Sequence, residues 1–306
     1  MRDTIPAALG GLAVRRSVTV PVLDHLDPMQ GERPRLRPRF VDPSVQERFD
    51  RDGYVVLRAT AKAAVRPLRR LHHRLVGSAP DSFHSTLYTA DRDLKQEVDR
   101  QIFEVMEPII GTFLVDHQPL LANYVTKGRD PEATMPPHQD WTFVDEHAGA
   151  SYNVWVPLVD VDHRSGAISV LPGGHRIPFT IRGTETPNAF ADIEDEAARR
   201  MVELPMRAGD VLVHDHRMLH ASPPNRRRRP RLAVACALIG ADARPIHFRQ
   251  RGEGEVERFA IERDFFTEHT FGADLPPCAV ATGTVAFAQP ALTTEDLALL
   301  ASDDDA

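Results

Sequence analysis

His138 and Asp140 are the residues of this 306-residue chain whose types and spacing point most directly to chemistry. In an extended segment, side chains two positions apart lie on the same face, so this imidazole and this carboxylate could hold one metal ion. The pair alone is a weak signal, because the chain contains 14 histidines. A second imidazole would complete the facial triad that binds Fe(II) and leaves adjacent coordination positions open for a co-substrate and O₂.

Candidates for that second imidazole lie about eighty residues further along the chain, at the end of a predicted strand. They are His214, His216 and His220, and spacing alone does not choose among them. Arg231 follows eleven residues after the last of the three. A planar guanidinium at this place suits a two-point contact with the carboxylate of a co-substrate. The alternative interpretation of Arg231 is an ordinary surface arginine, because the arginine run 226–229 lies just before it.

The composition is that of an ordinary globular protein, with 42% hydrophobic and 26% charged residues. A net charge of −7 argues against a general nucleic-acid binder, which normally carries a basic surface. Only Cys236 and Cys278 are present, so we expect a reducing compartment and no disulfide framework. No apolar run approaches the roughly eighteen residues that span a bilayer. The apolar stretch 5–14 follows Asp3 and precedes Arg15, the wrong charge order for a secretory signal. We therefore expect a cytoplasmic protein without membrane partners.

Arginine dominates the basic residues, because only three of the 37 are lysines. This bias, typical of a GC-rich genome, predicts that the arginine run 226–229 is a solvated loop rather than a phosphate-binding patch. It also makes a tailoring enzyme of secondary metabolism the favoured kind of enzyme. Thr126, Lys127 and Arg129 precede the His138 motif in a loop that contains Gly and Pro, where a solvated turn is the simplest expectation.

Three parts are predicted along the chain. Residues 1–40 form an irregular N-terminal arm, residues 41–290 form one domain, and residues 291–306 form a C-terminal helix and an acidic tail. In the domain, a helix capped by Asp42 or Ser44 ends at Gly53, and residues 54–57 form a strand. Further helices are predicted at 61–77 and from Leu94 to a stop near Pro108.

Short segments bounded by Gly, Pro and Asp follow, which is typical of strands. They are residues 119–126, 151–159, 167–171, 203–207, 210–216 and 231–240, and a helical insert near 189–202 interrupts them. Strands without regular alternation with helices indicate a closed or double-layered sheet that carries helices on one side. We therefore predict a mainly β fold with flanking helices and a jelly-roll core.

The chain resembles the phytanoyl-CoA dioxygenase family of Fe(II)- and 2-oxoglutarate-dependent oxygenases. The resemblance rests on blocks that occur in the family's order. They are residues 49–57, 137–141 (Pro-His-Gln-Asp-Trp), 153–158 (Asn-Val-Trp-Val-Pro-Leu), 166–175 and 220–225, followed by Pro230-Arg231. Gly174 departs from the pattern, because the family usually has serine there.

The resemblance implies a double-stranded β-helix (cupin-like) core and a set of site residues. The implied iron ligands are His138, Asp140 and His220. Arg231, with help from Ser222, is the implied partner of the distal carboxylate of 2-oxoglutarate, and Gln139 and Trp155 match positions near the cofactor. The implied reaction uses Fe(II), 2-oxoglutarate and O₂ to oxidise, and most simply to hydroxylate, an unactivated C–H bond of a small molecule, with release of succinate and CO₂.

Asp140 discriminates within the family, because the related halogenases lack this carboxylate and bind chloride in its place. Its presence favours oxygen transfer. Two other classes of function stay open: a cupin-type metalloenzyme that does not use 2-oxoglutarate, and a non-catalytic binding protein on the same scaffold. Trp141, Phe143 and Tyr124 are candidates for the wall of a substrate cavity, although aromatic residues in strands more often belong to the core.

Overall fold

The computed structural model describes residues 39–78, 81–177, 181–252, 254–271, 273–287 and 292–301. Most of the predicted N-terminal arm and the acidic end of the predicted tail lie outside these residues. No helix in the described ranges is long and apolar enough to cross a membrane.

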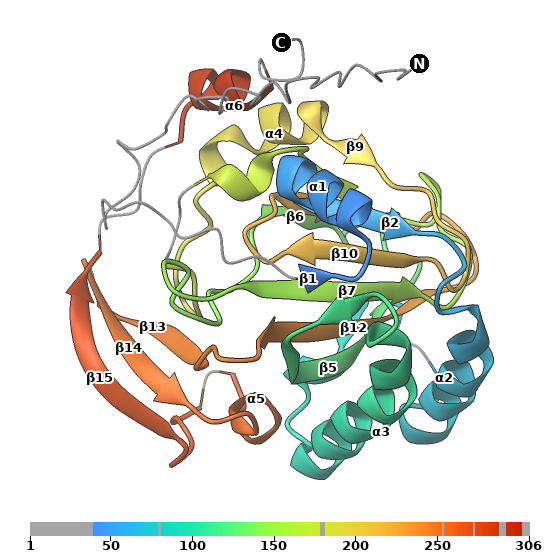
Figure 1. Cartoon of the computed structure of the whole chain (residues 1–306), viewed down its shortest axis with the longest axis horizontal. Coiled ribbons are helices and arrows are strands. Elements are labelled where there is room, and N and C mark those ends of the chain that lie inside the picture. The colour runs from blue at the N-terminus through green and yellow to red at the C-terminus, as the bar shows by residue number, and fades with distance from the viewer. Residues whose placement is uncertain are drawn as a thin grey trace, which may run out of the picture.

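Two antiparallel sheets face each other and form the core of the molecule (Figure 1). The larger sheet has the order β2 (Tyr54–Leu57), β10 (Val211–Asp215), β7 (Ser151–Pro157), β12 (Arg231–Gly240), β5 (His117–Lys127) and β3 (Phe83–Ser85). The smaller sheet has the order β6 (Met135–His138), β11 (His220–Ser222), β8 (Ser169–Val170) and β9 (Val202–Glu203). This arrangement confirms the predicted mainly β fold with a jelly-roll core.

Alternation along the central strands separates the inside of the barrel from its outer face. Trp155 and Leu212 pack in a cluster inside the barrel, whereas their neighbours Val154 and Val213 pack in a different cluster with the helices. A period of two of this kind is the signature of a strand that is buried on both faces but in two different environments. The same alternation places Asn153 and His214, which are direct partners between β7 and β10, on the inner side.

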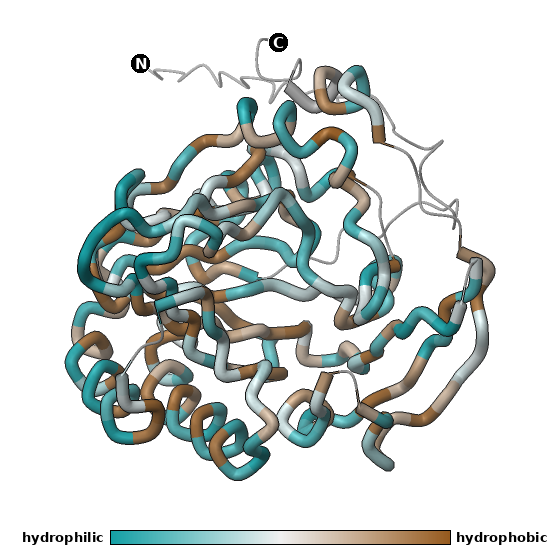
Figure 2. Tube along the Cα trace, turned by 180° about the vertical axis from the view of Figure 1, so that it is seen from behind, coloured by the Kyte–Doolittle hydropathy of each residue, from teal (hydrophilic) through white to brown (hydrophobic). Residues whose placement is uncertain are grey.

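Three helices cover the outer face of the larger sheet. They are α1 (Pro43–Asp52), α2 (Lys62–Leu75) and α3 (Arg92–Ile110). Leu68 of α2 and Met106 of α3 are both fully buried in the cluster that these helices share with the sheet. Figure 2 shows hydrophobic and hydrophilic residues alternating along the coils of α2 and α3.

Helix ends follow the predicted signals. Asp42, and not Ser44, is the N-cap of α1, because its carboxylate accepts a hydrogen bond from the Ser44 N–H. Gly53 ends this helix in the left-handed conformation, at φ +79°. Helix α3 ends at Ile110, two residues after Pro108, so the predicted stop near that proline is confirmed. One missing N–H in the last turn costs a single hydrogen bond, and burial of Ile110 outweighs it.

The predicted strands are confirmed for the long central strands and for β2, which spans the predicted residues 54–57. Of the predicted strand 203–207, only Glu203 lies in β9, and Met206 makes an isolated bridge to Val161. The short strands β6 and β11 were not predicted. The insert near 189–202 is confirmed, as a 3-10 turn at Ala191–Ile193 and the helix α4 (Glu194–Arg200). At the C-terminus, α6 (Thr294–Ala301) is also present.

A third sheet beside the barrel was not predicted at all (Figure 1). It consists of β13 (Ile246–Gly252), β14 (Glu255–Ile261) and β15 (Ala279–Ala286), and the short helix α5 (Phe265–Glu268) follows β14. The remaining strands, β1 (Arg39–Phe40) and β4 (Leu114–Val115), pair with each other. The extra sheet therefore belongs to the segment that we predicted as part of the single domain 41–290.

His247 of β13 lies in the aromatic cluster between this extra sheet and the barrel. Its ring centroid is 5.0 Å from that of Phe265 and 6.2 Å from that of Trp141. The side chain is fully buried, and its Nδ1 has no hydrogen-bond partner among the described residues. Burial, together with the nearby His269 and Arg249, lowers the pKa of His247 to about 3.

We expect the stability of the protein to fall as the pH drops below about 6.5. His247 stays neutral in the folded state, while the unfolded chain takes up a proton below its ordinary pKa, so protonation favours unfolding. The loss from this one group approaches about 1.4 kcal/mol per pH unit. Urea unfolding between pH 7.5 and 5 should show a shallower pH slope for His247→Phe than for the original chain. An unchanged slope would contradict the assignment.

Candidate metal centre

Strand pairing brings two histidines together that are 82 residues apart in the sequence. His138 at the end of β6 and His220 at the start of β11 are direct partners in the antiparallel pair. Their ring centroids are 4.2 Å apart. The structure therefore selects His220 from the three histidines that spacing left open.

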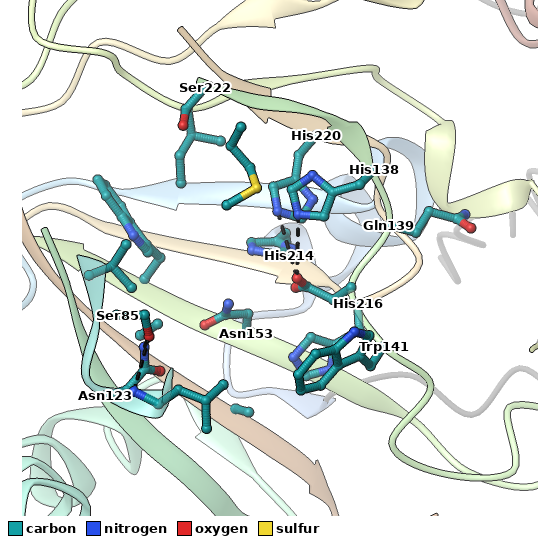
Figure 3. Close-up of a pocket in the computed structure, with 18 of the residues that line it drawn as sticks. Ser85, Asn123, His138, Gln139, Trp141, Asn153, His214, His216, His220 and Ser222 are labelled. Carbon is teal, nitrogen blue, oxygen red and sulfur yellow. Dashed lines mark hydrogen bonds and ion pairs between the residues drawn. The ribbon is translucent and has the colours of Figure 1, made fainter. Parts of the chain in front are cut away.

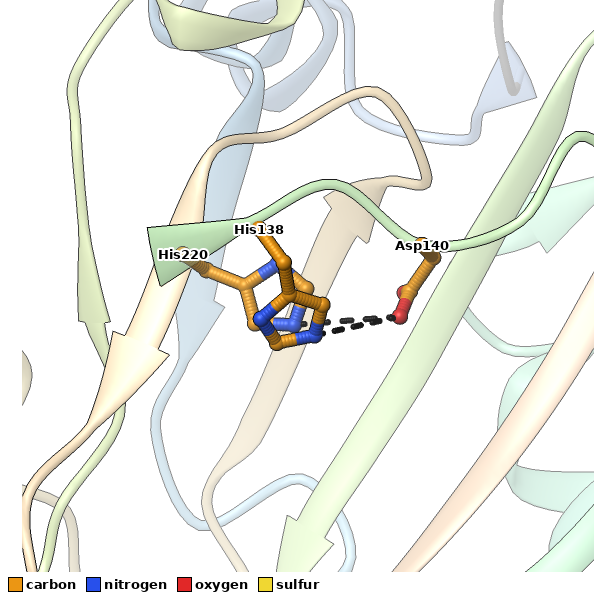
Figure 4. A group of neighbouring side chains, drawn as sticks. All are labelled: His138, Asp140 and His220. Atoms are coloured by element: carbon orange, nitrogen blue, oxygen red, sulfur yellow. Dashed lines mark ion pairs between the residues drawn. The ribbon is translucent and has the colours of Figure 1, made fainter. Parts of the chain in front are cut away.

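Asp140 completes the group from the loop that leaves β6 (Figure 4). Its backbone N–H donates to the carbonyl of His216 at 2.9 Å, which turns the loop so that the carboxylate faces the histidines. The Asp140 Oδ1 atom lies 3.9 Å from Nε2 of His138 and 3.8 Å from Nε2 of His220. Within the described part of the chain, these three residues are the one group with metal-ligating atoms all within 4.8 Å of one another.

Hydrogen bonds orient both imidazoles for metal binding. Nδ1 of His138 is 2.8 Å from the Pro136 carbonyl, and Nδ1 of His220 is 2.9 Å from the Met218 carbonyl. A carbonyl only accepts, so both Nδ1 atoms carry the proton and both Nε2 atoms present a lone pair. Such outer contacts of ligating histidines fix the tautomer and the ring orientation.

The electrostatics of the three residues also fit a cation. Burial and the neighbouring His220 lower the pKa of His138 to about 4, and burial lowers the pKa of His220. Burial alone would raise the pKa of Asp140, but nearby histidines, His220 first among them, hold it below its usual value. The Oδ2 atom of Asp140 is buried without a hydrogen-bond partner among the described residues. Two neutral imidazoles and one carboxylate form the donor set that is typical of non-haem Fe(II) sites.

Arg182 supports the loop that carries Asp140, a role that the sequence did not reveal. Its Nε donates to the Asp140 carbonyl at 2.6 Å, and its guanidinium binds Glu146 through two contacts of 2.5 and 3.1 Å. Arg182 and Glu146 are only 9% and 7% exposed. Arg182 lies outside every motif of the sequence, so only the fold shows that it contacts the metal-binding loop.

Arg231 begins β12 and lines the same cavity as the triad. Its Nη1 donates to the Gly166 carbonyl at 2.6 Å, and its guanidinium carbon is 5.6 Å from the centroid of Trp155. No described carboxylate pairs with Arg231, which is 2% exposed, and its Nε is buried without an acceptor. Burial lowers the pKa of Arg231 to about 10, since the charge has little solvation. This guanidinium is therefore an anion site with no protein anion in it.

The other predicted cofactor contacts are Ser222, Trp155 and Gln139, and all three border the cavity. Ser222, 5% exposed, and Trp155, 3% exposed, line the same cavity as Arg231. Gln139 also borders the cavity, but its amide donates to the carbonyls of Arg217 and Ile177 at 2.6 and 3.3 Å. Figure 3 shows the Gln139 side chain directed away from the histidines.

The cavity has a volume of about 1070 Å³, its open mouth included. Two of the three candidate aromatics, Trp141 and Phe143, line it together with further apolar residues: Phe83, Leu87, Tyr88 and Leu121. Tyr124 belongs to the core, the more common place for an aromatic residue of a strand, and its hydroxyl donates to the Leu68 carbonyl on the outer, helix-covered face. His214 lines the cavity and packs 4.9 Å from His220, and His216 packs 4.6 Å from Phe143, measured between ring centroids.

Two segments were expected to form solvated loops, and only one of them does. The arginine run 226–229 is exposed, and Arg227 pairs with Asp162, as expected of a solvated loop. Lys127, by contrast, is fully buried at the end of β5, so the solvated turn expected there is wrong for this residue.

The chain matches the model of a known protein family over more than half of its length. The model of the family described as phytanoyl-CoA dioxygenase (PhyH) matches residues 49–233. The peroxisomal phytanoyl-CoA dioxygenase of Rattus norvegicus is 23% identical over 171 residues, which are 53% of this chain and 50% of that protein. A phytanoyl-CoA dioxygenase domain-containing protein 1 homolog of Dictyostelium discoideum is 26% identical over 127 residues, 39% of this chain and 45% of that one. The chain thus spans about half the length of these curated relatives.

A solved structure supports the fold. The epimerase SnoN, crystallised in complex with Fe³⁺, alpha ketoglutarate and nogalamycin RO, superposes with a TM-score of 0.51 and 21% identity. The superposition covers 79% of this chain and 97% of SnoN.

The Arg182–Glu146 pair offers a test of how the Asp140 loop is held. Arg182→Met leaves a buried carboxylate unpaired and should cost about 3–5 kcal/mol of stability. The double variant Arg182→Met/Glu146→Leu removes both charges and should recover most of that loss. Its Fe(II) affinity, measured anaerobically by competition with a chelator, should stay about 10- to 100-fold below that of the original chain, because the Asp140 carbonyl has lost its donor. Full recovery of Fe(II) affinity in the double variant would show that Arg182 does not position the ligand.

Proposed function

This chain belongs to the phytanoyl-CoA dioxygenase family, and we propose that it is an Fe(II)- and 2-oxoglutarate-dependent dioxygenase that oxidises an unactivated C–H bond of a small molecule. The observation that carries the proposal is a single cavity lined both by the His138–Asp140–His220 group and by the Arg231 guanidinium, which has no carboxylate partner among the described residues. Hydroxylation is the simplest outcome, with succinate and CO₂ as co-products.

His138, Asp140 and His220 would hold the iron on one face and leave the side toward the cavity open. When bound, Fe(II) and 2-oxoglutarate supply the oxidative chemistry by activating O₂. The protein's own residues determine where that chemistry acts. The carbonyls of Pro136 and Met218 keep the imidazole lone pairs on the metal side, and Arg182 holds the Asp140 loop in place.

Arg231 would bind the distal carboxylate of 2-oxoglutarate. Its guanidinium is held on one face by Trp155 and at one nitrogen by the Gly166 carbonyl, so its direction is fixed before the ligand arrives. A preorganised fork of this kind reads a carboxylate through two hydrogen bonds and loses little entropy on binding. Ser222 lines the same part of the cavity and is the natural second donor to the carboxylate.

The rest of the cavity favours a neutral small molecule as substrate. Apart from Asp140 and Arg231, its lining contains aromatic, aliphatic and uncharged polar side chains together with histidines. Asn123 donates to Ser85 at 2.8 Å on one wall, and Asn153 projects into the space between that wall and the histidines (Figure 3). SnoN binds nogalamycin RO in a related fold, which agrees with our proposal of a natural-product intermediate as the substrate class.

Two alternatives remain distinguishable by experiment. A cupin-type metalloenzyme would bind iron at the triad but leave Arg231 without a ligand. A binding protein would keep its ligand affinity after His138 and Asp140 are both replaced by alanine, whereas the dioxygenase would lose succinate formation. Halogenation is disfavoured, because the Asp140 carboxylate occupies the position that a halide would need.

Anaerobic addition of Fe(II) and then 2-oxoglutarate to the metal-free protein should produce the visible metal-to-ligand charge-transfer band of a chelated 2-oxo acid. Arg231→Ala should weaken 2-oxoglutarate binding by roughly one to three orders of magnitude, since it removes charge-assisted hydrogen bonds of about 1.5–3 kcal/mol each. Arg228→Ala, a change in the exposed loop, is the matched control and should leave binding unchanged. Iron binding without any band would reject 2-oxoglutarate and favour the cupin alternative.

A further inference from the structure

Lys127 lies directly opposite Arg231 in the β5–β12 pair, so two cations face each other on neighbouring strands. Lys127 is 0% exposed and Arg231 is 2% exposed. Like charges at directly opposed positions destabilise a sheet. Neither side chain forms an ion pair with any carboxylate in the described part of the chain. A folded chain tolerates such an arrangement when a bound anion supplies the missing negative charge.

The contacts of Lys127 determine the direction of one hydroxyl group. Its Nζ lies 2.9 Å from the Ser222 carbonyl, 2.7 Å from the Ser222 Oγ and 2.9 Å from the Pro223 carbonyl. An ammonium group has three N–H donors and no acceptor, so in the charged form of Lys127 these three contacts use all of its donors. In that form Ser222 Oγ accepts from Lys127. Its own O–H is left to donate elsewhere, and no described protein group accepts it.

Tight packing holds the lysine in this position. Gly166, whose carbonyl accepts from Arg231, has φ +74°, and a Cβ built on it would lie 3.2 Å from the Lys127 Cδ and 2.5 Å from the Pro223 carbonyl oxygen. The aliphatic stem of Lys127 therefore runs directly beneath the backbone of Gly166. Only glycine allows this close approach at a positive φ.

We propose that Lys127 is a positioning residue of the dicarboxylate site: it fixes the Ser222 hydroxyl as a donor into the cavity and adds a second positive charge beside Arg231. The inference rests on the proposed 2-oxoglutarate function and extends it to a preference for 2-oxo acids that carry a distal carboxylate. Burial and the nearby Arg231 lower the pKa of Lys127 to about 6. A carboxylate bound in the cavity would counter that effect and stabilise the ammonium form.

Affinities of two 2-oxo acids separate this role from a purely structural one. Anaerobic Fe(II) titrations would follow the charge-transfer band with 2-oxoglutarate and with 2-oxobutyrate, which chelates in the same way but lacks the distal carboxylate. Lys127→Met should weaken 2-oxoglutarate binding about 10- to 100-fold, the equivalent of one charge-assisted contact, and leave 2-oxobutyrate binding unchanged. Adding Ser222→Ala to this variant should cost little more, because the serine donor is no longer oriented. Lys62→Met, at an exposed lysine, is the matched control.

Equal losses for both ligands, or no loss for either, would overturn the proposal. Absence of a band in the original chain would instead reject the proposed function itself, so the two failures are distinguishable. If Lys127→Met does not fold, the original chain provides a second measurement. It contains only three lysines, so ¹³Cε-lysine labelling of the Zn(II)-loaded protein gives three signals. The Lys127 signal should shift with 2-oxoglutarate but not with 2-oxobutyrate, and a Lys127 signal that ignores both would also overturn the proposal.

Discussion

The antiparallel pairing of β6 with β11 is the constraint on which the site depends. It places His138 opposite His220 and directs both imidazoles into the space between the two sheets. Side chains alternate along a strand, so a register slip of one residue would turn one histidine to the outer face and separate the pair. The Asp140 loop, its contact with the His216 carbonyl and its support by Arg182 all follow from where β6 ends.

The cavity is bordered by groups of both signs of charge. The Asp140 carboxylate has an unsatisfied oxygen and lies beside two neutral imidazoles, which suits a cation. Arg231 lines the cavity without a counter-ion among the described residues, and Lys127 lies opposite it in the sheet, which suits an anion. Burying unpaired charge is costly, and bound ligands of opposite sign would offset that cost at both groups. Iron together with a 2-oxo acid that has a distal carboxylate would supply both, while the neutral aromatic walls leave room for a substrate.

Local signals in the sequence predicted the parts of the fold that local physics determines. Capping at Asp42 and Gly53, the period of α3 and the long strands β5, β7, β10 and β12 follow from residue types within a few positions. The short strands β6 and β11 have no such signal, since three or four residues form a strand only because their partners are present. Resemblance to a family was needed to choose His220, which the structure places beside His138 and Asp140. Burial of Lys127 and the Arg182 support could not be predicted, because both depend on segments far apart in the chain.

A crystal structure of the protein grown anaerobically with Fe(II) and 2-oxoglutarate tests the proposed site most directly. We expect iron bound by His138, Asp140 and His220, chelated by the 2-oxo acid, with the distal carboxylate on Arg231 and the Ser222 hydroxyl. The same carboxylate should lie close to Lys127 without displacing it from Ser222. Iron bound by other residues, or a 2-oxoglutarate that points its distal carboxylate away from Arg231, would contradict the central claim.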